Sequence, residues 1–113
     1  MDSLIDQVKL FVKERDWDQF HSPKNLAIGL SIEASELLEI FLWLSEEESK
    51  KLPKNKINDL KEEIGDILIY LINLADKFNL DPIECARNKI EVNKKKYPIE
   101  IVRGSAKKYT EYE

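Results

Sequence analysis

Apolar side chains recur along most of this chain at intervals of three and four residues, the spacing of one face of an α-helix. Three stretches show it, residues 2–15, 22–44 and 56–78, and a fourth begins at residue 81 and ends before Pro98. No stretch alternates apolar and polar positions as a half-buried strand does. The pattern therefore predicts an all-α, four-helix-bundle-like fold.

Local signals mark where these helices begin. Residues 22–23 are Ser-Pro and residues 81–82 are Asp-Pro, each an N-cap followed by proline at the first helical position. Ser45 with Glu48 three residues later predicts a capping box for a short turn that ends before Pro53. The tail, residues 99–113, shows little periodicity and is expected to be irregular.

The length of 113 residues indicates a single domain over residues 1–113. The second helix is apolar around nearly its whole circumference, so it should be buried on several sides. A chain this short covers such a helix most easily by assembling with copies of itself. We therefore expect a homo-oligomer, either a dimer or a tetramer.

Charge and composition exclude several classes. The net charge of −4 argues against binding a nucleic acid polymer through a broad positive surface. No run of about 18 apolar residues predicts a membrane span, and the first residues lack a signal-peptide pattern, so we expect a cytoplasmic protein. The single Cys85 cannot form an intramolecular disulfide.

Two acidic pairs carry the candidate chemistry. Glu33 and Glu36 lie three apart on the second helix, and Glu63 and Asp66 lie three apart on the third, so each pair shares a helical face. Glu33 and Glu63 each sit beside apolar positions, whereas Glu62 projects to a more solvated side. If the helices pack antiparallel, all four carboxylates converge.

Converging carboxylates need raised pKa values or a cation. Ligands that are all oxygen favour Mg²⁺, with Mn²⁺ possible, completed by water and substrate phosphates. His21 is not three residues from any of these acids, which argues against a di-iron site. The alternative is a non-catalytic helical interaction module in which the acids form a solvated face or interhelical ion pairs.

A second polar row lies on the fourth helix. Lys89, Asn93 and Tyr97 are spaced by four, so they form one stripe with a cation, an amide and a phenol. Such a row suits a polyphosphate and its sugar. Alternatively, Tyr97 packs against other side chains and Lys89 is solvated. From composition alone, Trp17 and Trp43 are expected as core or interface aromatics.

Several segments together resemble a known family. The two acidic pairs, with 26 residues between them, look like the Glu-x-x-Glu and Glu-x-x-Asp signature of the all-alpha nucleoside triphosphate pyrophosphohydrolases, the MazG-like group. Further segments resemble the dCTP pyrophosphatase branch of that group, namely residues 15–21, 23–26, 39–43, 66–71, 93–98 and 104–109. The likeness covers about residues 11–112.

This resemblance implies a helical homo-oligomer that hydrolyses a nucleoside triphosphate to a monophosphate and pyrophosphate, as nucleotide-pool housecleaning. The substrate would be dCTP or a modified dCTP, and a dUTP-directed or broad-specificity enzyme is the alternative. The residues that the resemblance makes functional are the metal ligands Glu33, Glu36, Glu63 and Asp66, the base-pocket residues His21 and Trp43, and the phosphate or sugar contacts Lys89, Asn93 and Tyr97. Glu36 and Glu39 are both candidates for the general base.

Overall fold

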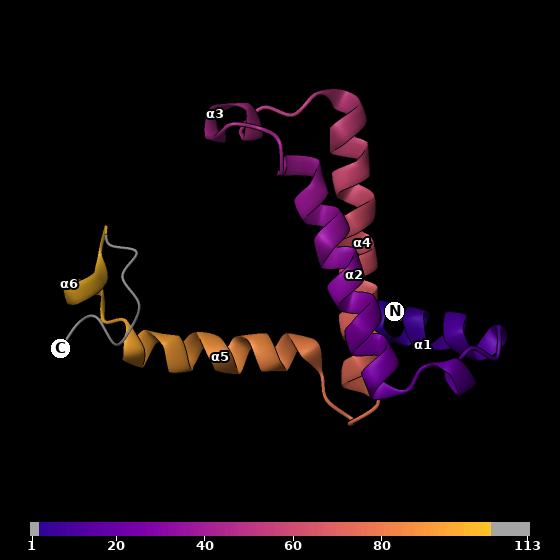
Figure 1. Cartoon of the computed structure of the whole chain (residues 1–113). Helices are drawn as coiled ribbons and strands as arrows, with labels where there is room; N and C mark the ends of the chain where they lie inside the picture. The colour runs from indigo at the N-terminus through magenta and orange to yellow at the C-terminus, as the bar shows by residue number, and fades with distance from the viewer. Residues whose placement is uncertain (1–2, 105–113) are drawn as a thin grey trace. The chain divides into compact units, whose positions relative to one another are not determined.

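The computed structural model describes residues 3–104, which form helices joined by short turns (Figure 1). In chain order the elements are α1 (Leu4–Glu14), the 3₁₀ turn η1 (Asp18–Phe20), α2 (Pro23–Phe41), α3 (Glu46–Ser49), α4 (Lys54–Asp76), α5 (Pro82–Lys96) and α6 (Ile99–Val102). No strand occurs in residues 3–104, and the prediction of an all-α fold is confirmed.

The predicted helix starts are confirmed by their hydrogen bonds. The Ser22 side chain accepts a bond from the backbone N–H of Asn25 at 3.1 Å and so caps α2. Ser45 and Glu48 exchange both bonds of a capping box at the start of α3. These caps stabilise helix ends whose N–H groups have no partner within the helix.

Helix ends differ from the prediction by a few residues. The second helix ends at Phe41 rather than at residue 44, because the next capped turn already begins at Ser45. The third long helix starts at Lys54, directly after Pro53, and ends at Asp76. The tail was expected to be irregular throughout, which is wrong for residues 99–102, since these form α6; residues 105–113 lie outside the described part.

The chain divides into two compact units, residues 1–79 and 80–113. In the first unit α2 packs antiparallel along α4, and α1 packs against α4 (Figure 1). Its buried hydrophobic residues are Val8, Val12, Leu26 and Ile72. The second unit holds α5 and α6, neither of which has a buried residue. A single domain over residues 1–113 stays a prediction.

The apolar surface of α2 is mostly uncovered. Leu26 is the buried residue of this helix, whereas Ile28, Ile32 and Leu38 are 50%, 54% and 57% exposed. The burial on several sides that the sequence predicts for α2 does not occur within one chain. Among the described residues, no helix is long and apolar enough to cross a membrane.

Candidate functional site

Three carboxylates meet where α2 packs along α4. Glu33 and Glu36 lie one turn apart on α2, and Glu63 approaches them from α4. One oxygen from each of the three carboxylates lies within 4.8 Å of the other two. Negative charges this close repel one another, so the cluster requires a shared proton or a cation.

Two oxygens of this cluster are hidden from solvent. The Oε2 atoms of Glu33 and Glu63 are buried and have no hydrogen-bond partner among the described residues. Both side chains are half-buried, whereas Glu36 is exposed. Because a buried polar atom without a partner costs free energy, these oxygens are poised to bind a proton or a cation.

The cluster raises the pKa of the Glu63 carboxyl group to about 7. The largest cause is a hydrogen bond with Glu33, followed by partial burial and by the negative charges of Glu33 and Glu36. Ionised carboxylates only accept hydrogen bonds, so this bond requires a proton on one of the two groups. A cation bound by these carboxylates would displace such a proton.

The donor set fits a hard divalent cation. The three converging groups offer only carboxylate oxygens, which suit Mg²⁺ or Mn²⁺ better than softer metals. Three carboxylates also leave coordination positions for water and phosphate oxygens. The buried oxygens of Glu33 and Glu63 also favour a bound cation, because they have no hydrogen-bond partner among the described residues.

An acidic cavity of about 360 Å³ opens beside the cluster. Glu36 and Glu63 line it together with Glu39 and Glu62. Glu62 is exposed to solvent, as expected, yet it still faces the same space. Lys56 adds a positive charge, and within residues 3–104 it forms no ion pair.

Asp66, the fourth predicted ligand, is not one of the three converging carboxylates. It follows Glu63 by one turn of α4, is exposed, and lines a second cavity of about 270 Å³. The other residues that line this second cavity are Phe11, Val12, Trp17, His21, Ile69, Tyr70 and Asn73. We call it the aromatic cavity. A ligand role for Asp66 stays a prediction.

Aromatic rings form one side of the aromatic cavity. Phe11 and Trp17 meet edge to face, with ring centroids 5.6 Å apart and planes at 75°. The guanidinium carbon of Arg15 lies 3.8 Å from the centroid of the Phe11 ring. Tyr70 packs so closely on Gly29 that a Cβ there would lie 2.3 Å from its ring. Such walls suit a planar ring by stacking.

A tight turn at the end of α1 holds Trp17 in this wall. The Trp17 N–H donates to the Val12 carbonyl and the Asp16 N–H donates to the Lys13 carbonyl, both at 3.1 Å. Asp16 has a φ of 52°, a left-handed conformation that glycine usually adopts at the end of a helix. Sequence reasoning missed Trp17 and Phe11 as cavity residues, because an aspartate at this position gives no glycine signal for the turn.

His21 and Trp43, which the resemblance assigns to one base pocket, lie at opposite ends of α2. His21 lines the aromatic cavity, whereas Trp43 is 90% exposed beyond the last residue of the helix. The 19 residues of α2 span about 28 Å. One chain does not bring the two side chains together, so a shared pocket requires a second copy.

The predicted phosphate and sugar contacts lie in the second unit. Lys89 and Asn93 are on α5, and Tyr97 directly follows its last residue. The four-residue spacing places Lys89 and Asn93 on the same side of the helix. Their contact with a substrate stays a prediction.

Comparison with known proteins identifies the family. Residues 28–112 match the MazG-like family, a range that contains both acidic pairs. The chain belongs to the MazG-like family. The resemblance read from the two acidic pairs and the surrounding segments is thereby confirmed.

This MazG-like chain is similar to curated proteins and to a solved structure. It is 42% identical to dCTP pyrophosphatase 1 of Mus musculus over 103 residues, and 39% identical to dCTP pyrophosphatase 1 of Homo sapiens over 104 residues. Each match covers 89% of this chain but 61% of the relative, so the chain spans about three-fifths of those proteins. The crystal structure of a pyrophosphatase from Archaeoglobus fulgidus superposes with a TM-score of 0.78 at 44% identity, covering 84% of this chain and 89% of that one.

In this MazG-like chain the carboxylate cluster lies next to the aromatic cavity, because consecutive turns of α4 contribute to each. Glu63 belongs to the cluster, and Asp66, one turn later, lines the cavity. A ligand could therefore contact a cation with one end and the aromatic walls with the other.

Proposed function

We propose that this protein hydrolyses a deoxynucleoside triphosphate, dCTP or a modified dCTP, to the monophosphate and pyrophosphate. The observation that carries the proposal is the convergence of Glu33, Glu36 and Glu63 with two buried oxygens that have no partner. The names of its relatives, dCTP pyrophosphatase and pyrophosphatase, support the same reaction. Such an enzyme would serve nucleotide-pool housecleaning.

Glu33, Glu36 and Glu63 would hold Mg²⁺, or Mn²⁺ in its place, and Asp66 is the proposed fourth ligand. The bound cation supplies positive charge that neutralises phosphate oxygens and lowers the pKa of an attacking water. The residues contribute by their placement, since Glu33 and Glu63 are half-buried and each brings an oxygen within 4.8 Å of the others.

The reaction requires a group that takes a proton from water. The water oxygen forms a bond to the α-phosphorus, the bond from that phosphorus to the bridging oxygen breaks, and pyrophosphate leaves. Glu36 and Glu39 both line the acidic cavity and are the candidate bases for the released proton. Lys56, in the same cavity, is placed to balance charge on the leaving pyrophosphate.

The aromatic cavity is the proposed base site. Phe11, Trp17 and Tyr70 offer ring surfaces for stacking, and His21 offers a polar edge. Asp66 links this cavity to the carboxylate cluster, so the sugar would lie near Asp66. Trp43 reaches a base pocket only from a second copy of the chain.

We also propose that the functional form is a homo-oligomer. The hydrophobic core of the described residues consists of Val8, Val12, Leu26 and Ile72, which is small for a domain of this length. The large exposed apolar side chains of α2 and α4 include Ile28, Ile32, Leu38, Ile64 and Leu68. Burial of this surface against another copy removes it from water.

Hydrolysis of a nucleotide panel tests the proposed reaction. The protein is incubated with Mg²⁺ and dCTP, dUTP, dTTP, CTP or 5-methyl-dCTP, and the products are separated by chromatography. Monophosphate and pyrophosphate should form, and the reaction should be lost in Glu63→Gln but kept in Glu47→Gln, which changes an exposed acid of α3.

The relative rates decide between a dCTP-directed enzyme and a dUTP-directed or broad-specificity one. No turnover of any nucleotide by folded protein with Mg²⁺ present would contradict the reaction. That outcome would favour the non-catalytic interaction module.

A further inference from the structure

Asn73 of α4 has a polar side chain that the fold does not use. It is half-buried, and within residues 3–104 its amide group makes no hydrogen bond. Because this half-buried amide uses neither its two donors nor its acceptor within the fold, a ligand in front of it can bond to them. Asn73 lines two cavities at once, so the space in front of it is open to a ligand.

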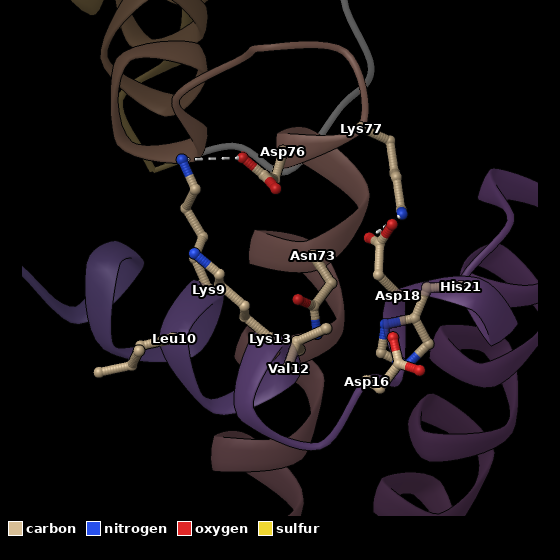
Figure 2. Close-up of a pocket in the computed structure, with 10 residues that line it drawn as sticks. All are labelled: Lys9, Leu10, Val12, Lys13, Asp16, Asp18, His21, Asn73, Asp76 and Lys77. Carbon is tan, nitrogen blue, oxygen red and sulfur yellow. Dashed lines mark hydrogen bonds and ion pairs between the residues drawn. The ribbon is translucent and has the colours of Figure 1, made fainter.

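The second of these cavities continues beyond the aromatic cavity. It has a volume of about 360 Å³ and shares Val12, His21 and Asn73 with the aromatic cavity. Figure 2 shows the Asn73 side chain in its centre, between the ion pair of Lys9 with Asp76 and that of Lys77 with Asp18. We call it the polar cavity.

Successive residues of α4 place these features in one line. Glu63, Asp66, Tyr70 and Asn73 follow one another at intervals of three and four residues and therefore share a helical face. From Glu63 to Asn73 the helix rises by about 15 Å. Along this line lie first the carboxylates, then the aromatic walls, then the amide.

A nucleoside triphosphate has the same order of parts, with phosphates, sugar, base ring and polar base edge. If the phosphates bind at the carboxylate cluster and the ring stacks in the aromatic cavity, the outer edge of the base points towards Asn73. The first polar group that this edge meets, apart from His21, is then the unpartnered amide.

We propose that Asn73 is a base-binding residue that hydrogen-bonds the outer edge of a pyrimidine base, with the polar cavity beyond it. This inference rests on the proposed function. An amide presents a donor beside an acceptor, which matches the amino group and ring nitrogen of cytosine. When the amide group is rotated by 180°, it also matches the carbonyl and N–H of uracil, so Asn73 can bind the edge of either base.

Replacement of Asn73 by residues of similar size tests this role. Asn73→Asp offers only acceptors when ionised, so with either base it keeps one bond, to the cytosine amino group or to the uracil N–H, and opposes the neighbouring ring nitrogen or carbonyl. The value of kcat/KM should therefore fall about tenfold for dCTP and for dUTP. Asn73→Leu removes both bonds and should lower kcat/KM for both nucleotides about tenfold, mainly through KM. Asn58→Leu, at an exposed position of the same helix, should leave both values unchanged.

Binding measurements separate this inference from the proposed reaction. The dissociation constant of the non-hydrolysable α,β-imido-dCTP should rise about tenfold in Asn73→Leu, whether or not any nucleotide is hydrolysed. Equal hydrolysis and binding in wild type and both Asn73 variants would overturn the role of Asn73 while leaving the reaction intact. A fall in kcat with unchanged KM in Asn73→Leu would overturn it as well, because the loss of a contact to the base raises KM.

Discussion

Cation binding at the carboxylate cluster should release protons in a manner that depends on pH. The pKa of Glu63 is raised from 4.5 to about 7 by Glu33, by partial burial and by Glu36. The cluster should therefore carry about nine-tenths of a proton per chain at pH 6, about half at pH 7 and about one-tenth at pH 8. A cation that takes the place of this proton expels it.

Calorimetric titration measures this number. The protein is titrated with MgCl₂ at each pH in two buffers that differ in their heat of ionisation, and the difference in observed heat gives the protons released. The expected values follow the protonated fractions, falling from about 0.9 at pH 6 to about 0.1 at pH 8.

Variants locate the group that releases the proton. Glu63→Gln, titrated at higher Mg²⁺ concentrations, should release none, whereas Glu47→Gln should behave as wild type. Proton release that does not change between pH 6 and 8, or that persists in Glu63→Gln, would refute the reasoning.

Three further predictions concern stability and assembly. Because the folded-state pKa of Glu63 lies above its usual value, its stabilising contribution is complete below about pH 4.5 and is lost as pH rises through about 7. The Tm of the cation-free protein should therefore fall between pH 5 and 8 by more than that of Glu63→Gln, and parallel curves would contradict the shift. Asp16→Gly should stabilise the fold by about 1 kcal/mol in chemical denaturation, since glycine tolerates φ 52° better than aspartate does; a loss would show that the bond from Gln19 to the Asp16 carboxylate outweighs that relief. Sedimentation should show a dimer or tetramer, and Ile32→Asp on the uncovered face of α2 should shift it towards monomer; a wild-type monomer at micromolar concentration would contradict the assembly.

The sequence predicted those features that depend on local chemistry. Helix starts at Ser22, Ser45 and Asp81 were correct because each cap is a bond between residues two or three apart. Glu63, and not Glu62, lies with Glu33 and Glu36, because helical angles fix which side of α4 each residue occupies. Its role as a metal ligand stays a prediction.

Features that depend on contacts between helices could not be predicted. Phe11 and Trp17 line the aromatic cavity because α1 packs against α4 and because Asp16 adopts a left-handed turn, neither of which the periodicity reveals. The expected burial of α2 is missing from one chain, since Ile28 and Ile32 face outward. These exposed apolar side chains are the structural reason to expect that a second copy of the chain covers α2.

The position of the bond that is cleaved tests the central claim most directly. The protein is incubated with dCTP and Mg²⁺ in water enriched in ¹⁸O, and the products are examined by ³¹P nuclear magnetic resonance. We predict dCMP and pyrophosphate, with the ¹⁸O in the phosphate of dCMP and none in pyrophosphate. Label in pyrophosphate, or release of dCDP and phosphate, would contradict water attack at the α-phosphorus.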